Sequence, residues 1–175
     1  MSAPEFSRTV RVDTLGAAPR RIEIAADESE RAALARRFGF VEIDRLEAEA
    51  AVAIRGDVVT AEGSIRAGVT QSCVATGEPV GEVVETPFAV EFRPHPKTSG
   101  PEEEIELQDG ELDVVFYDGG AVDLGEAVAE TLSLSVTSYP RAPGAEEHLR
   151  EAGVKSEAEA GPFGALAGLK DKLGK

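Results

Sequence analysis

Cys73 is the residue whose type best suits covalent chemistry, because a thiolate is a strong nucleophile. It is the single cysteine of the chain. The two histidines, His95 and His148, lie in proline-rich and linker-like sequence, and no spacing ties either one to Cys73. A cysteine at the end of an alternating strand is more often a small buried hydrophobic residue. The sequence also has no phosphate-binding glycine loop, paired-histidine metal motif or nucleophile elbow. We therefore expect a protein that is not an enzyme, with no catalytic residue, cofactor or metal.

Acidic side chains dominate the charge of the chain. Its formal net charge is -15, and residues 98–140 hold eleven acids and no Lys or Arg. Such a surface repels nucleic acid and attracts basic proteins. The alternative interpretation is a solvated, mobile loop over about 94–110 that keeps the protein soluble. The acidic candidates for binding a partner are Glu102, Glu103, Glu104 and Glu106.

An amphipathic helix is predicted over residues 123–138. Asp123 and Glu126 have the spacing of a capping box. The apolar stripe consists of Leu124, Val128, Leu132 and Val136. Pro140 predicts the end of the helix, because the residue before a proline is pushed out of helical conformation. Tyr139 and Arg141 flank this proline and are candidate binding residues, although Tyr139 could simply pack at the edge of the domain.

A sheet is predicted from the period-two pattern between Val41 and Phe92. Three consecutive antiparallel strands, over about 46–55, 59–73 and 84–92, would form a meander with one apolar face for the helix to cover. A bend is expected in the second strand, at Gly63 or Gly68.

Shorter elements surround this meander in the prediction. Valines and isoleucines near 10–12 and 22–24 suggest a two-stranded hairpin, and residues 112–116 suggest another strand. A second helix is expected over 28–38, capped by Asp27 and ended at Gly39. Together these elements predict an α+β fold.

The predicted organisation is a single domain over 1–140, a linker over 141–161 and a short amphipathic helix over 162–175. The apolar residues of that terminal helix are Phe163, Leu166 and Leu169. A helix this short is marginal alone, so we expect it to dock on its own domain or on a partner. The chain has no run long enough to span a membrane, no apolar leader and one cysteine, which favours a cytoplasmic protein.

Three stretches, taken in order, resemble the YceD family, which is linked to accumulation of large-subunit ribosomal RNA. The first is residues 69–79, where Cys73 and Thr76 occupy the positions of the family's C-x-x-C. The second is residues 122–141, which resemble the family's I-D-L segment, acidic helix and proline end. The third is residues 162–170, similar to its closing P-F-x-x-L-x-x-L. The order of the motifs carries the resemblance, which spans most of the chain.

The resemblance implies a non-enzymatic bacterial factor that supports ribosome assembly. In many relatives the cysteines suggest a zinc site, but here Thr76 replaces the second one and no later cysteine exists. We therefore expect the turn to be held by backbone bonds and the Thr76 hydroxyl.

The kind of partner remains open between two binding modes. The first is a ribosomal protein or assembly factor held by the acidic region and the C-terminal helix. The alternative is direct contact with precursor ribosomal RNA, and neither mode involves DNA or a membrane. Arginines for RNA are concentrated only near the N-terminus, at Arg8, Arg11, Arg20, Arg21, Arg31, Arg36 and Arg37. A small-molecule enzyme is a third, disfavoured class.

Overall fold

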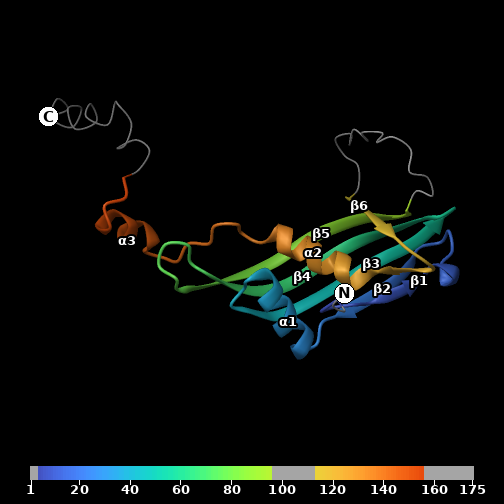
Figure 1. Cartoon of the computed structure of the whole chain (residues 1–175), viewed down its shortest axis with the longest axis horizontal. Helices are drawn as coiled ribbons and strands as arrows, with labels where there is room; N and C mark the ends of the chain where they lie inside the picture. The colour runs from blue at the N-terminus through green and yellow to red at the C-terminus, as the bar shows by residue number, and fades with distance from the viewer. Residues whose placement is uncertain (1–3, 96–112, 156–175) are drawn as a thin grey trace, which may run out of the picture. The chain divides into compact units, whose positions relative to one another are not determined.

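The computed structural model describes residues 4–95 and 113–155 (Figure 1). The chain divides into two compact units. Unit 1 comprises Met1–Gln71 and Gly81–Ser138, and unit 2 comprises Ser72–Val80 and Tyr139–Lys175. The predicted C-terminal helix and most of the predicted acidic loop, including all four candidate glutamates, lie outside the described residues.

A five-stranded sheet forms the larger part of unit 1. In spatial order its strands are β2 (Arg20–Ala25), β3 (Glu42–Arg55), β4 (Val58–Ser72), β5 (Pro79–Pro94) and β6 (Asp113–Tyr117). Strands β3 and β4 pair antiparallel, as the alternating pattern predicted, and β2 pairs antiparallel with the other side of β3. Strand β6 pairs with β5 in the parallel direction, so the sheet is mixed. The predicted α+β class is confirmed.

One face of the sheet carries the core. Leu46 and Val52 on β3, Ile65 on β4, and Phe88 and Phe92 on β5 are all buried, which is the face that the period-two pattern predicted. The hydrophobic effect of burying these side chains is the main stabilisation of such a sheet.

The pairing of β3 and β4 is irregular beside Gly68, one of the two positions at which a bend of β4 was expected. The β3–β4 register shifts between Ile43 and Arg45, next to Gly68. A Cβ atom on Gly68 would lie 2.0 Å from Asp44 Oδ1, so only glycine leaves room for that carboxylate. Gly63 has a similar role, because a Cβ there would lie 1.8 Å from Glu49 O.

The N-terminal strands do not form the predicted hairpin. Strand β1 (Thr9–Arg11) pairs antiparallel with β7 (Ala121–Asp123), and a 3₁₀ turn, η1 (Val12–Thr14), follows it. Strand β2 pairs with β3 instead. The hairpin prediction was wrong because residues 121–123, more than a hundred positions away, supply a better partner for β1 than the local turn does.

Helix α1 (Glu28–Phe38) has the predicted bounds. The Asp27 side chain accepts a hydrogen bond from Glu30 N, and the Glu30 carboxylate accepts one from Asp27 N. Gly39 ends the helix in the left-handed conformation, with φ of 73°. Both ends are set by local sequence, which is why the prediction succeeds.

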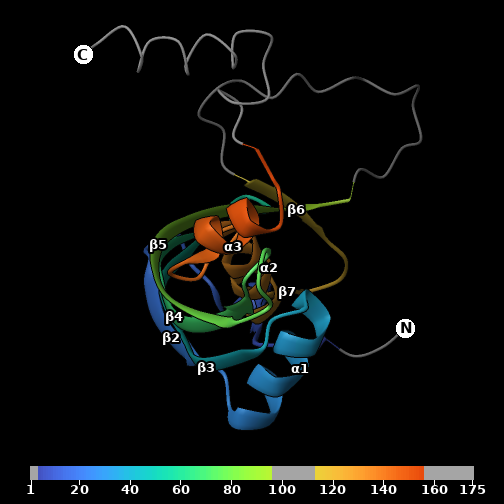
Figure 2. The same cartoon turned by 90° about the vertical axis from the view of Figure 1, so that its left-hand side faces the viewer.

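Helix α2 (Leu124–Ser135) covers the apolar face of the sheet, which curves around it (Figure 2). Asp123 caps it as predicted, but Glu126 binds Arg37 instead of completing a capping box. The helix also ends three residues before the predicted boundary. Glu82 on β5 binds the backbone N–H and hydroxyl of Thr137, which holds that residue outside the helix.

Unit 2 contains helix α3 (Ala145–Glu151), which lies within the segment interpreted as a linker. Gly144 precedes it with φ of 87°, a conformation that favours glycine. Across the described part of the chain, no helix has the length and apolar character required to cross a membrane.

Candidate partner-binding surface

The Cys73 sulfur joins the turn after β4 to the segment that begins at Tyr139. Sγ accepts hydrogen bonds from Ala142 N at 3.2 Å and from Ala75 N at 3.4 Å. Val74 N donates to Pro140 O at 2.9 Å. Two stretches that are more than 60 residues apart in sequence therefore meet through a thiol and a carbonyl.

The turn itself is closed by backbone bonds. Cys73 N donates to Glu78 O at 2.7 Å, and Gly77 N donates to Cys73 O at 2.9 Å. The Thr76 hydroxyl oxygen accepts a bond from Glu78 N at 3.3 Å. The turn is thus held as the sequence predicted, by backbone bonds and the Thr76 hydroxyl.

The environment of Cys73 favours its thiolate. The N–H of Ala142 and then the Thr76 hydroxyl lower the pKa of Cys73 to about 6, and together they outweigh the opposing effect of desolvation. The side chain is nevertheless buried, with 3 % exposure. A buried thiolate with filled acceptor positions serves as a hydrogen-bond acceptor, whereas a nucleophile needs access to its substrate.

Small apolar residues pack around this sulfur. Ala142 and Ala145 are buried against Cys73, and Ala75 and Val80 contact the same cluster. Larger side chains at Ala142 or Ala145 would push the backbone away from the sulfur. The alanine-rich composition of residues 142–145, which resembles a linker, thus allows close packing.

Tyr139 and Val74 project from this framework into solvent. Tyr139 is 76 % exposed and Val74 is 55 % exposed, although neighbouring Pro140 is buried. The alternative in which Tyr139 packs at the domain edge is therefore wrong. Tyr139 was a candidate binding residue from the sequence, but Val74 was not. The position of Val74 beside Pro140 depends on a contact between distant segments.

Arg141 also belongs to this exposed surface. Its guanidinium lies 3.9 Å from the carboxylate of Glu146, at the start of α3, and both side chains are largely exposed. This ion pair is long and exposed to water, so Arg141 can leave Glu146 and bind a partner at a small cost in free energy. We call the exposed side chains of Val74, Tyr139 and Arg141 the Tyr139 surface.

Most of the N-terminal arginines considered for RNA are engaged within the protein. Arg8 binds the Glu30 carboxylate through two nitrogens, at 2.7 and 2.8 Å, and Arg37 binds Glu126 in the same way. Arg31 donates to the backbone oxygens of Ile43 and Ala26. Arg11 and Arg21 pair with carboxylates. Only Arg20 and Arg36, among the seven, have no such partner within the described residues.

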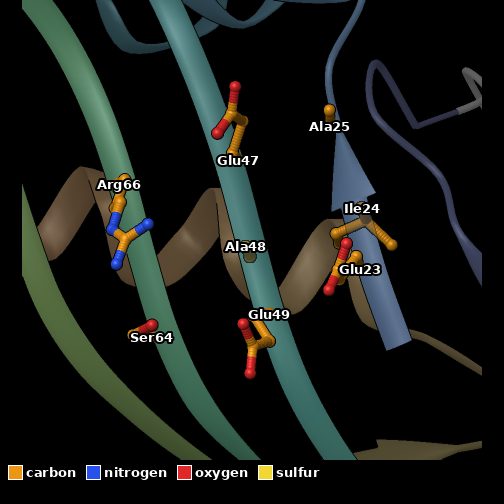
Figure 3. A pocket seen from close by; sticks show the side chains of 8 residues that line it. All are labelled: Glu23, Ile24, Ala25, Glu47, Ala48, Glu49, Ser64 and Arg66. Atoms are coloured by element: carbon orange, nitrogen blue, oxygen red, sulfur yellow. The ribbon is translucent and has the colours of Figure 1, made fainter. Parts of the chain in front are cut away.

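A pocket of about 370 Å³ lies on the face of the sheet opposite α2, which appears behind the strands in Figure 3. Its charged lining comes from three neighbouring strands: Glu23, Glu47, Glu49 and Arg66. Glu23 and Glu49 are direct cross-strand neighbours, and Arg21 lies within 3.3 Å of the first and 2.5 Å of the second. Sequence reasoning missed this pocket because it depends on the strand register.

Within residues 4–95 and 113–155, no group of three or more His, Cys, Asp or Glu side chains could hold a metal ion. His95 stacks on Phe116, with ring centroids 5.3 Å apart, and lies 3.8 Å from Asp118. Neither contact brings it to Cys73. Among the described residues, His95 and Cys73 thus have separate surroundings.

The fold and this surface describe an α+β protein in which a curved mixed sheet packs on one amphipathic helix and a cysteine turn holds a solvent-facing tyrosine. A family model with the description "Large ribosomal RNA subunit accumulation protein YceD" matches residues 61–170, which is more than half of the chain. The chain therefore belongs to the YceD family, as its motifs suggested. Comparison with curated proteins and with solved structures gives no match. The family is named for accumulation of the large ribosomal RNA subunit and not for an enzymatic reaction.

Proposed function

We propose that this protein supports accumulation of large-subunit ribosomal RNA, and so ribosome assembly, by binding a ribosomal protein or an assembly factor without catalysing a reaction. The Tyr139 surface is the observation that carries this proposal. An exposed aromatic side chain on a well-held backbone, with an arginine beside it, has the composition of a protein-binding hot spot.

The chemistry of the partner follows from charge. A chain with net charge -15 attracts basic proteins and repels polyanions. The acidic candidates Glu102, Glu103, Glu104 and Glu106 would supply a salt-dependent contact. Phe163, Leu166 and Leu169 of the C-terminal segment would supply an apolar one.

Direct binding of precursor ribosomal RNA is the second candidate. RNA affinity depends on Lys and Arg side chains that displace counterions from phosphates. The engaged arginines described above leave Arg20 and Arg36 as the most available ones for this role. The balance of charge therefore favours the protein partner.

Affinity purification of the tagged full chain from its own cells, with and without ribonuclease, tests the proposal. We expect ribosomal proteins or assembly factors to remain bound after ribonuclease. The variant Val74→Ser/Tyr139→Ser should lose them, because it removes both exposed apolar side chains. Val83→Ser is the matched control, since Val83 is 82 % exposed in unit 1. It should retain the partner.

Two further variants separate the acidic contact from RNA binding. Changing Glu102, Glu103, Glu104 and Glu106 to Gln should weaken association and reduce its dependence on salt. Recovery of precursor ribosomal RNA only without ribonuclease, and its loss in Arg20→Gln/Arg36→Gln, would instead establish the RNA-binding function and overturn the protein-partner proposal.

A further inference from the structure

Strand β2 forms an edge of the five-stranded sheet, with β3 as its single neighbour in that sheet among the described strands. An edge strand presents backbone N–H and C=O groups that can pair with another strand. Proteins often prevent this pairing by placing charged side chains on the edge strand. Here the charges are arranged so that the edge is complementary to itself.

The register identifies which backbone groups face the open edge. Ala26 N donates to Leu46 O, and Ile24 pairs with Ala48 further along the same ladder. Because backbone directions alternate in an antiparallel ladder, the even-numbered residues of β2 face β3. Arg21, Glu23 and Ala25 consequently face the open edge.

One of these open groups already has a partner. Arg8 Nη2 donates to Ala25 O at 2.7 Å, which agrees with the direction assigned to Ala25. Within the described part of the chain, no hydrogen bond from this side reaches the backbone of Arg21 or Glu23. Two residues with four backbone groups remain available for a second strand.

We propose that the open edge of β2 binds β2 of a second copy of this chain, antiparallel, with the two-fold axis at Ile22. In this register Arg21 lies opposite Glu23 of the second copy, and Glu23 lies opposite its Arg21. Each opposed pair exchanges two backbone hydrogen bonds. All four open groups of both copies are then satisfied.

The ends of the strand fit the same register. Ala25 lies opposite Pro19 of the second copy, and proline has no N–H that would need an acceptor. The Ala25 carbonyl, which already accepts from Arg8, is therefore not required to accept another bond. Arg8 and Pro19 together limit the pairing to the central residues.

Side-chain charges favour this register over the adjacent one, in which the two-fold axis lies at Glu23. The Arg21 and Glu23 side chains are 66 % and 70 % exposed, so each can reach its opposite charge across the axis. Directly opposed unlike charges stabilise a strand pair, and like charges destabilise it. Moving the axis to Glu23 would oppose the two Glu23 carboxylates and direct Arg21 N to the occupied Ala25 O. The axis at Ile22 avoids both conflicts.

Sedimentation of the full chain over a concentration series tests the proposal. The strand pair is short, so we expect a weak dimer whose population rises with concentration. Arg21→Glu and Glu23→Arg should each weaken dimerisation at least tenfold, because the two-fold axis repeats every like-charge contact. The double variant Arg21→Glu/Glu23→Arg should restore it. Thermal melting by circular dichroism would show that each variant is folded.

A backbone variant tests the edge without relying on charge alone. Glu23→Pro removes an N–H that faces the open edge and leaves the bonds to β3 intact, as proline on an edge strand permits. It should be monomeric, whereas Glu23→Gln, which keeps the N–H, should dimerise more strongly than Glu23→Pro. A wild-type chain that stays monomeric at all concentrations would overturn the proposal. So would a dimer that is unaffected by the single charge changes and by Glu23→Pro.

Discussion

The carboxylate of Glu82, on β5, accepts hydrogen bonds from both the backbone N–H and the hydroxyl of Thr137, each at 3.0 Å. Gln71 Nε2 donates to Thr137 O, also at 3.0 Å. All three polar groups of Thr137 are thus bound by side chains of the sheet. Helix α2 ends at Ser135 because the sheet holds the residues that would continue it.

Glu82→Ala should lower the free energy of unfolding by about 1–2 kcal/mol, because hydrogen bonds to a charged group are lost. Denaturation with urea measures this change. Glu85→Ala is the control: its carboxylate is exposed and lies 3.9 Å from Arg66, so its effect should stay within about 0.5 kcal/mol. Equal effects of the two substitutions would contradict the role given to Glu82.

Asp123 should be among the most sensitive exposed or half-buried acids of unit 1. It accepts bonds from Gly125 N and Glu126 N at the start of α2, and from Arg8 N and the Ser7 hydroxyl. Asp123→Ala should cost about 2–3 kcal/mol, since it removes a helix cap and leaves other donors unpaired. Chemical denaturation measures the loss, and Asp118→Ala, at an exposed position near His95, should be nearly neutral. A neutral Asp123→Ala would refute this assignment.

Gly125→Ala should destabilise the protein, although alanine is the better helix former. A Cβ atom at this position would lie 2.5 Å from Phe6 O and 2.8 Å from Arg8 N, which are backbone atoms that cannot turn away. We expect a loss of about 1–3 kcal/mol from overpacking. Gly120→Ala is the matched control, because nothing lies within 4 Å of its Cβ position. A stabilised Gly125→Ala protein would show that the N-terminal segment can move aside.

The Cys73 turn should respond to pH near 6. A thiol in an unfolded chain has a pKa of about 8.5, whereas bonds to Ala142 and Thr76 lower the folded value to about 6. The thiolate therefore adds its full stabilisation above about pH 8.5, and this stabilisation is lost as the pH falls through 6.

Nuclear magnetic resonance of the Ala142 amide measures this titration. Its shift in the wild-type protein should move with a midpoint of about pH 6. Cys73→Ser keeps an acceptor but does not titrate in this range, so its Ala142 shift should stay flat. A wild-type amide that is insensitive between pH 5 and 9 would contradict the thiolate assignment.

Features with local causes were predictable from the sequence. Helix α1 has both of its ends encoded within two residues of its bounds, by Asp27 and Gly39. The buried face of β3 follows from strict alternation of side chains. Tyr139 and Arg141 are candidates for binding because a proline after a helix makes a corner, and the exposure of both side chains depends on the same local feature.

Features with distant causes were not predictable in this way. The end of α2 depends on Glu82, which is 55 residues away from Thr137. The partner of β1 and the parallel direction of β6 likewise depend on pairings between remote segments. At the Tyr139 surface, the alanine-rich residues after Pro140 resemble a linker in sequence. In the structure they pack against Cys73, a contact that local sequence does not reveal. Local patterns describe which face of an element is apolar, but they do not say which element covers it.

The pairing of β1 with β7 affects the order of events during synthesis of the chain. Ser7 binds Asp123, 116 residues later. At ribosomal rates of roughly 5–20 residues per second, the N-terminal segment waits on the order of ten seconds for this partner. Phe6 and Val10, which are buried in the finished protein, have no β7 or α2 to pack against during that interval. Residues made early are thus among the last of unit 1 to reach their final positions, and they close this unit only after the start of α2 has emerged.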